Sequence, residues 1–415
     1  MNALTYSGIE GFLKRFDALR PHLPGEADAR AQAAALLRAQ GLPSIRDEAW
    51  KYTNLRPLTQ ASFRAATTAD PAALLARLPQ LDAPRLVMID GHYRADLSNA
   101  PAHAQISTFA TAPHFGPLAN PAREPLVALN TMLAEDGFSL TIPAQIDAGL
   151  IIIAHLSTAA HAIHPRHAIT LEAGSRASLL EIYLGEGAYL HNPVTEIHIG
   201  ENASLTHARL QDESAASFHL STLYTQIAAH GTYDSFSLNI GARLARTELH
   251  ASLAGTHATA HLNAAQILTD AQHADFTTIV SHEAPHGASR QTVKNALAGR
   301  SRGVFQGKIH VARGAQKTDG YQMNQALLLS PDAEIDSKPQ LEIYADDVKC
   351  SHGATVGELD ADQLFYLRSR GVPATQARAM LVRAFLSEAI DTVTNDLSRA
   401  VLEAAVELWW QRHPA

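Results

Sequence analysis

Short segments of similar sequence recur in the middle of this chain, and they constrain its fold more than any other feature. The segment LEAGSRASL begins at Leu171 and resembles IHIGENASL, which begins at Ile197, so that Gly174 aligns with Gly200. A looser third copy, LNIGARLAR, begins at Leu238. Repeats of about 20 to 50 residues bury their apolar faces against one another, either as stacked coils or as radial blades. A spacing in the twenties favours a β-helix with three short strands in each coil over propeller blades of about 40 residues.

The repeats lie within a longer region of strand-like sequence that helical sequence flanks on both sides. From about Ala144 to Val356, short apolar runs are separated by Gly, Asn and Asp, and the spacing typical of long helices is absent. We therefore expect a mainly β protein with three parts: an N-terminal helical and small α/β region at residues 1–143, a parallel β-helix core at 144–358, and a C-terminal helical module at 359–415.

Helix start and stop signals support this division. Ser7 and Glu10 have the spacing of a capping box, and Gly41 has the position of a helix C-cap. Asp360 suits the start of a C-terminal helix that ends near Gly371. The last helix is expected to carry one apolar stripe, formed by Leu397, Val401, Ala404 and Leu408. Trp409 and Trp410 follow it, and they either form a docking surface or pack against the β body.

Composition excludes several classes of partner. The 415 residues carry a formal net charge of −8 and no dense run of Lys and Arg, which argues against nucleic acid. The longest apolar runs, such as LIIIAHL at residues 150–156, are far shorter than the roughly 20 residues of a membrane span. The N-terminus lacks the pattern of a secretory signal, and a single cysteine cannot form an internal disulfide. We therefore expect a cytoplasmic protein that has no membrane partner.

The single cysteine, Cys350, lies just before His352 in the segment DDVKCSHGATVGEL, with one serine between them. The alternation in this segment predicts a strand on which the thiol and the imidazole project from the same face, about 7 Å apart. Two ligands are too few for a zinc or iron–sulfur centre, which usually takes about four. If a metal binds here, the remaining ligands must come from another chain, another site or exogenous sulfide.

Two other interpretations of this pair stay open on local sequence alone. Cys350 can be a small buried residue of the solenoid interior, with His352 as its polar neighbour. A catalytic cysteine and histidine pair is less consistent with the sequence. Such residues are usually remote in sequence and must point toward each other, whereas a strand places these two side by side.

The segment GVFQGKI at residues 303–309 superficially resembles a phosphate-binding loop. It is one residue short and has Ile309 where a magnesium-binding Ser or Thr is required. We interpret it as part of a strand and turn. If ATP is needed by this protein, another subunit must hydrolyse it.

Two further clusters are weaker candidates. His155, His161, His164 and His167 surround a Pro-interrupted turn without helical ligand spacing or acidic neighbours in sequence, which argues against a metal site. Acidic residues of the last β portion could supply a carboxylate pair to a β-helix enzyme that acts on polysaccharide, although Asp is also common in turns: Asp319, Asp332, Asp336, Asp346 and Asp347.

Two stretches of the chain resemble a known family. They are RDEAWKYTNLRPL at residues 46–58 and KTDGYQMNQALLLSPDAEIDSKPQLEIYADDVKCSHGATVGELDADQLFYLRSRGV at residues 317–372, which AFLSEAI follows. Both strongly resemble the SufD-like proteins, subunits of the SUF iron–sulfur cluster assembly machinery. The resemblance implies a right-handed parallel β-helix flanked by helical domains, and a subunit that is not itself an enzyme. The single cysteine favours a SufD-like over a SufB-like subunit, because accepting sulfur requires more than one thiol.

The resemblance also implies partners and site residues. A SufB-like subunit would pair with this chain through the ends of the two β-helices, and a SufC-like ATPase would bind the C-terminal helices, giving a SufBCD-type complex. His352 would be the iron ligand from this chain, with Cys350 as a less certain helper, and a thiolate of the SufB-like subunit would complete the site. No cofactor would be tightly bound to this subunit alone, and a transient Fe–S cluster would form in the complex. The residues expected to bind the ATPase are Leu364, Phe365, Leu367, Arg368, Leu381 and Phe385.

Two alternatives to this function remain. One is the β-helix enzyme that acts on polysaccharide, and the other is a metal-free structural homodimer. Co-expression with SufB-like and SufC-like partners separates them, because only the scaffold function requires a stoichiometric complex with both.

Overall fold

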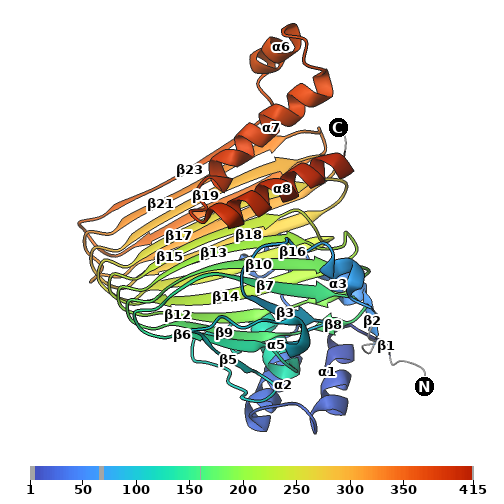
Figure 1. Cartoon of the computed structure of the whole chain (residues 1–415), viewed down its shortest axis with the longest axis vertical. Coiled ribbons are helices and arrows are strands. Elements are labelled where there is room, and N and C mark those ends of the chain that lie inside the picture. The colour runs from blue at the N-terminus through green and yellow to red at the C-terminus, as the bar shows by residue number, and fades with distance from the viewer. Residues whose placement is uncertain (1–4, 65–69, 159, 414–415) are drawn as a thin grey trace.

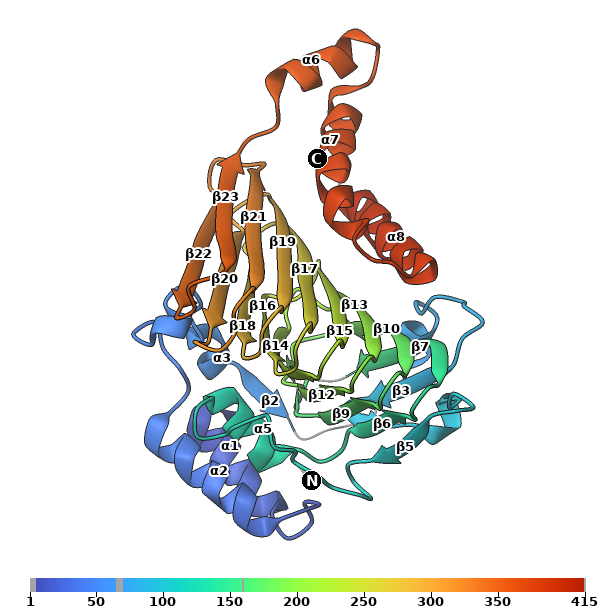
Figure 2. The same ribbon diagram turned by 90° about the vertical axis from the view of Figure 1, so that its left-hand side faces the viewer.

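The computed structural model describes residues 5–64, 70–158 and 160–413, and most of them form a parallel β-solenoid (Figure 1). The predicted mainly β fold is confirmed. Residues 1–4, which begin the segment considered for a targeting signal, lie outside the described residues. The helices lie outside the solenoid, at its N-terminal end and along one face (Figures 1 and 2).

Two large sheets form the walls of the solenoid. We call the ten-stranded one the first sheet, and its strands are β3 (Arg85–Ile89), β4 (His92–Tyr93), β7 (Asp147–Ser157), β10 (Arg176–Gly185), β13 (Ser204–Asp212), β15 (Thr232–Asn239), β17 (Thr259–Leu268), β19 (Ala288–Leu297), β21 (Asp319–Leu328) and β23 (Lys349–Gly357). The second sheet contains β5 (Gln105–Thr108), β6 (Phe138–Ile142), β8 (Ala162–Ile163), β9 (Arg166–Leu171), β11 (Leu190–His191), β12 (Val194–Ile199), β14 (Phe218–Ile227), β16 (Leu244–Leu253), β18 (His273–His282), β20 (Arg302–Val311) and β22 (Glu334–Ile343).

The remaining elements are short strands and helices. A small antiparallel pair joins β1 (Thr5–Ser7) to β2 (Ser62–Arg64). The helices are α1 (Gly8–Leu19), α2 (Ala27–Gln40), η1 (Glu48–Trp50), α3 (Arg56–Gln60), α4 (Ala72–Leu75), η2 (Ala95–Leu97), α5 (Pro125–Leu133), α6 (Ala361–Ser369), α7 (Ala374–Ile390) and α8 (Asp396–Arg412). Strands that precede residue 144, such as β3 and β6, already belong to the two large sheets.

Most coils of the solenoid contain one strand of each sheet, so the expectation of three strands in each coil holds only for the first coils. In the first coils the second-sheet strand is interrupted, as β8 with β9 and β11 with β12, whereas later coils have one continuous strand, such as β14, β16 and β18. The length of chain in a coil also varies. Phe218 of β14 pairs with Leu244 of β16, whereas Arg302 of β20 pairs with the more distant Glu334 of β22.

One corner of the solenoid, where the chain passes from the second sheet to the first, explains the repeat in the sequence. A residue with positive φ occupies this corner in successive coils, and its N–H donates to a carbonyl of the next coil. Gly174 holds this position in its coil, and Asn202, not Gly200, holds it in the next. The third sequence copy is not equivalent, because Gly241 lies at the opposite corner. The corner column comprises Gln145, Gly174, Asn202, His230, His257, His286 and Lys317.

Apolar side chains alternate along the strands and fill both the interior and the outer faces. The interior cluster includes Leu140, Ile151, Ile169 and Leu205, each almost completely buried. A fully buried side chain of this size contributes about 1.5–3 kcal/mol to folding. The helices α7 and α8 cover the outer face of the first sheet, and α1, α2 and α5 pack on the outer face of the second.

The helices agree with the sequence prediction in position and differ in detail. Gly41 ends α2 with a φ of 76°, and the Asp360 side chain accepts hydrogen bonds from the backbone N–H groups of residues 362 and 363 at the start of α6. Ser7 makes no side-chain capping bond, so the predicted capping box is wrong. The stripe predicted for the last helix is also wrong, because Leu397 and Leu408 are about half exposed. The buried face of α8 comprises Ser398, Leu402, Ala405, Val406, Trp409 and Trp410.

Among the helices of the described residues, none is both long enough and apolar enough to cross a bilayer.

Candidate functional site

The two ends of the solenoid differ. At the N-terminal end, the first sheet finishes with the short antiparallel strand β4 and the second with the short antiparallel strand β5. At the C-terminal end, the last strands are β22 and β23, which are much longer and pair on one side only (Figure 2). Long strands with unpaired N–H and C=O groups are templates for another chain. We call this C-terminal end, formed by β22 and β23, the open end.

Cys350 and His352 lie on β23 at the open end, as the alternation in the sequence predicted. In the parallel register Cys350 pairs with Gly320 of β21, and His352 pairs with Gln322. The buried Gln322 belongs to the interior-facing set of β21, so its neighbour His352 continues that interior face to the last strand. Among the described residues no further strand pairs with β23 in the first sheet, and most side chains of β23 are exposed to solvent.

The Cys350 thiol is half-buried beside the last apolar layer of the interior. It packs against a small cluster that includes Ile309 and Val311, and its Sγ lies over Gly320. Burial is the largest cause that raises the pKa of Cys350 above its usual value, so the free chain holds a protonated thiol at neutral pH. A bound metal or a nearby cation would be needed to favour the thiolate.

The His352 imidazole is exposed, and among the described residues nothing is hydrogen-bonded or ion-paired to it. Its nitrogens are therefore free to bind a ligand that approaches from outside. The described chain brings three ligand atoms within reach of one ion at two other places, His191–Glu213–His219 and Glu124–Glu248–His250, and neither group includes Cys350 or His352. Cys350 and His352 therefore offer two potential metal ligands at the surface of this chain.

Exposed apolar side chains also lie at the open end, and the sequence did not mark them as site residues. Ile343 at the end of β22 is 39% exposed, Tyr344 is 61% exposed, and Val356 on β23 is 54% exposed. Large apolar side chains on unpaired strands favour a protein interface. In the sequence these residues lie in the last two strand-like runs before the helical module, which could have suggested an exposed edge. That these runs end the solenoid follows only from the arrangement of the coils.

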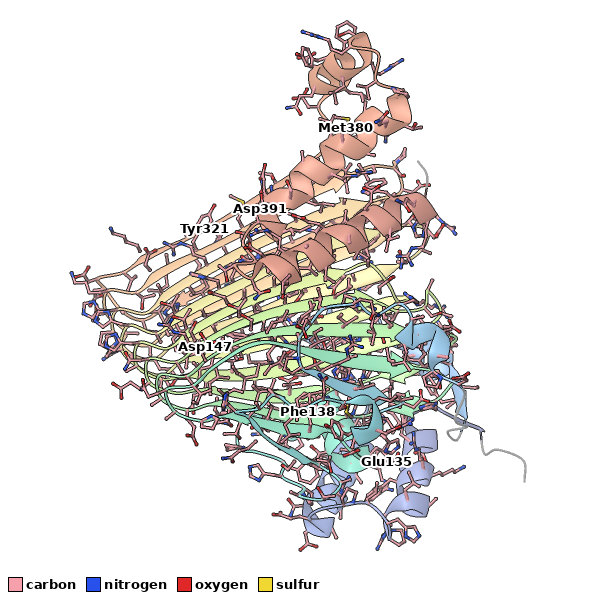
Figure 3. The ribbon with its side chains drawn as sticks, viewed as in Figure 1. Glu135, Phe138, Asp147, Tyr321, Met380 and Asp391 are labelled. Carbon is pink, nitrogen blue, oxygen red and sulfur yellow. The ribbon has the colours of Figure 1, made fainter. Side chains whose placement is uncertain are left out.

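The C-terminal module extends beyond the solenoid. Helix α6 projects away from the sheets, and Met380 on α7 also lies outside the β body (Figure 3). Of the predicted ATPase-binding residues, Phe365 is 73% exposed and Arg368 is exposed. Leu364, Leu367 and Leu381 are partly buried.

The C-terminal half of this module is fixed to the solenoid. Phe385 packs against the outer face of the first sheet, with the Lys294 ammonium 4.4 Å from its ring centroid. Lys294 also forms an ion pair with Glu388 of α7. Trp409 and Trp410 are buried, so these tryptophans pack against the β body and are not a docking surface.

The N-terminal motif RDEAWKYTNLRPL packs against the outer face of the second sheet. Trp50 is buried under the Arg246 guanidinium, which lies 4.0 Å from its ring centroid. The buried Thr53 hydroxyl donates to Asp275 at 2.5 Å, and Asp275 is also ion-paired with Arg246. The motif therefore connects the helical N-terminal region to β16 and β18.

The other sequence candidates have structural positions. GVFQGKI forms part of β20, as expected of a strand, and does not form a phosphate loop. Three of the candidate acidic residues form ion pairs with cations, Asp319 with Arg290, Asp336 with Arg302, and Asp347 with Lys317. These pairs give no support to a pair of catalytic carboxylates.

The four histidines of the candidate cluster have no acidic neighbours in sequence, but two of them contact carboxylates in space. His155, His161, His164 and His167 are buried. His155 Nε2 lies 2.9 Å from Glu181 Oε1, and His161 Nε2 lies 3.6 Å from Asp90. Strands from different coils bring these residues together, so sequence spacing could not reveal the contacts.

Family models and known relatives match most of the chain. A family model described as the SufBD core domain of SUF system FeS cluster assembly matches residues 154–385, and a second, the SufBD protein N-terminal region, matches residues 23–152. The chain is 33% identical over 395 residues to an iron–sulfur cluster assembly SufBD family protein of Synechocystis, covering 88% of this chain and 86% of the relative. It is 33% identical over 377 residues to the iron–sulfur cluster assembly protein SufD of Escherichia coli, covering 89% of each chain.

Proposed function

Because the chain belongs to the SufBD family of SUF-system iron–sulfur cluster assembly proteins, we propose that it is a non-catalytic scaffold subunit of the SufD type. It pairs through its open end with a SufB-like subunit and through its C-terminal helices with a SufC-like ATPase. A nascent Fe–S cluster forms at the junction with the SufB-like subunit and is then transferred. The cluster is the cargo of the complex.

One observation carries this proposal: Cys350 and His352 lie on the interior face of an unpaired last strand, where only a second protein can complete a metal site. A second solenoid that abuts this end would continue the two sheets by strand pairing. It would also cover Ile343, Tyr344 and Val356. Metal ligands supplied by two chains form a site that opens when the chains separate, as transfer of a cluster requires.

The chemistry of the two side chains supports different roles. His352 is exposed and can supply a ring nitrogen to iron. Cys350 is half-buried and protonated in the free chain, so it must lose a proton before it can bind metal. We therefore assign His352 as the first ligand from this chain and Cys350 as a helper.

The projecting helix α6 supports the assignment of the ATPase surface. Phe365, Tyr366 and Arg368 are exposed on a helix without buried residues, and aromatic and Arg side chains are enriched among interface hot spots. ATP-driven association of two SufC-like subunits would move α6. Because α7 is fixed to the first sheet by Lys294 and Glu388, that movement would strain the solenoid.

Co-expression with SufB-like and SufC-like subunits, followed by size-exclusion chromatography with light scattering, tests this function. We expect one stoichiometric complex of all three subunits. The double variant Tyr344→Glu, Val356→Lys should lose the SufB-like subunit and retain the ATPase. The double variant Phe365→Ala, Arg368→Ala should do the reverse, and Leu397→Ala, on the exposed side of α8, should retain both.

Two outcomes contradict the proposal. A chain that elutes as a homodimer and leaves both partners in other fractions would support the structural alternative. Turnover of glycans by the isolated chain would support the polysaccharide enzyme.

A further inference from the structure

A second group of metal-ligand side chains lies inside the solenoid, far along the sheets from the open end. We propose that His191, Glu213 and His219 form a binding site for one zinc ion, which stabilises the N-terminal coils. Their side chains are 1%, 0% and 3% exposed. One ligand atom from each lies within 4.8 Å of those from the other two.

The parallel register brings the two imidazoles together. His191 of β11 pairs with His219 of β14, so the rings project from equivalent positions of neighbouring coils. Glu213 follows β13 at the corner that leads into β14, and its carboxylate lies between the rings. His191 Nδ1 is 3.4 Å from Glu213 Oε1, and His219 Nδ1 is 2.7 Å from Glu213 Oε2.

The His191–Glu213 distance matches the spacing of two ligands on a tetrahedral ion, and the shorter His219–Glu213 distance would have to lengthen when an ion binds. Zinc bonds of about 2.0–2.2 Å to nitrogen and oxygen place neighbouring ligand atoms about 3.4 Å apart. His219 Nδ1 faces the carboxylate without the geometry of a hydrogen bond, and His191 Nε2 is buried without a hydrogen-bond partner among the described residues. Two histidines and a glutamate are a ligand set that zinc uses in proteins.

The carboxylate is held by groups outside the site, as metal ligands usually are. The Tyr189 hydroxyl donates to Oε1 at 2.9 Å, and the Gln211 amide donates to Oε2 at 3.0 Å. The Gly241 N–H donates to Gln211 Oε1, which fixes the orientation of that amide. Each carboxylate oxygen therefore keeps a lone pair for the space between the imidazoles.

The buried charge also requires compensation. Across the described chain, ion-pair contacts to Glu213 come only from His191 and His219, and no Lys or Arg is among them. A carboxylate inside a protein is costly unless a cation or several donors accompany it. The Tyr189 and Gln211 donors offset part of this cost, and a cation bound between the imidazoles would offset more of it.

The test uses the full chain without a histidine tag. The protein is unfolded in denaturant, refolded with Zn²⁺ or with Mg²⁺ alone, and washed briefly with chelator, and the retained zinc is measured by mass spectrometry. A buried site filled during folding should retain about one zinc ion per chain. His219→Ala and Glu213→Gln should retain at least tenfold less.

His207→Ala is the matched control. His207 is equally buried and contacts a different carboxylate, Glu181, at 3.0 Å, so this variant should retain zinc as the wild type does. X-ray absorption at the zinc edge of the wild-type protein supplies a second measurement that does not depend on variants folding. It should show two imidazole ligands.

Three results would overturn the proposal. They are a wild-type chain without chelator-resistant zinc, ligand variants that retain as much zinc as the wild type, and an absorption spectrum without imidazole. The first result would leave Glu213 with the Tyr189 and Gln211 hydrogen bonds and the two neighbouring imidazoles, without a metal ion.

Discussion

At the level of single residues, His352 is exposed and unpaired among the described side chains, which distinguishes it from most other histidines of the chain. His352→Ala should therefore change the free energy of unfolding by less than about 0.5 kcal/mol. It should nevertheless abolish iron–sulfur enzyme activity in cells that depend on this subunit, because the proposed shared site would lose its nitrogen ligand. The measurement is that enzyme activity alongside denaturant unfolding of the purified variant.

His257→Ala is the control for this prediction, because His257 is exposed at a solenoid corner away from the open end. It should leave the cellular activity unchanged. Normal activity in the His352 variant, in a strain without a related subunit, would contradict the assignment of the ligand.

The buried His282 gives a prediction about pH. Burial is the largest cause that lowers its pKa to about 4, and Nε2 contacts the Ser289 hydroxyl at 2.9 Å. The unfolded pKa is higher, about 6.5, so acid favours the unfolded chain and stability is lost as pH falls from about 6.5 toward 4. Between pH 7 and pH 5, the free energy of unfolding should fall by roughly 2 kcal/mol less in His282→Gln than in the wild type.

Denaturant unfolding of the wild type and this variant at the two pH values measures the difference. If the free energy of unfolding fell as much in His282→Gln as in the wild type, the prediction would be wrong. The imidazole would then be charged in the folded chain, or it would not occupy the buried position.

At the level of elements, the corners between the sheets decide how coils stack. Gly255 follows β16, and a Cβ built there would overlap the backbone of Ala228 and Ala229 in the preceding coil. That backbone is hydrogen-bonded into the corner column and cannot easily move. Gly255→Ala should therefore lower the free energy of unfolding by at least about 2 kcal/mol.

Gly314 provides a matched control at the same corner of a later coil, because a Cβ there has no atom within 4 Å. Gly314→Ala should change stability by less than about 0.5 kcal/mol. Thermal or denaturant unfolding of both variants measures the contrast, and equal stabilities would contradict the stacking described for this corner.

The same elements show what the sequence could and could not predict. Strand alternation depends on local geometry, so the shared face of Cys350 and His352 was predictable. The pairing of one coil with the next depends on corners whose lengths vary. The spacing of the first two sequence copies therefore applied to few coils, and the sequence comparison aligned Gly174 with Gly200 instead of Asn202. The buried side of α8 was misassigned because apolar residues such as Leu397 and Leu408 also lie on its exposed side. The buried histidine and glutamate contacts join several coils, which no local pattern reports.

At the level of the whole molecule, the solenoid is closed by short antiparallel strands at one end and open at the other. Stability in such a stack depends on contacts between neighbouring coils, so a coil with one neighbour opens more readily than an internal coil. In the free chain, backbone amides of β22 and β23 should exchange with deuterium faster than those of β14 and β16.

Hydrogen–deuterium exchange of the chain, alone and bound to a SufB-like subunit, tests most directly whether the open end is the place of assembly. Binding should slow exchange in β22 and β23 and leave exchange in the central coils unchanged. Unchanged exchange in these two strands, with protection at another surface of the chain, would contradict this prediction.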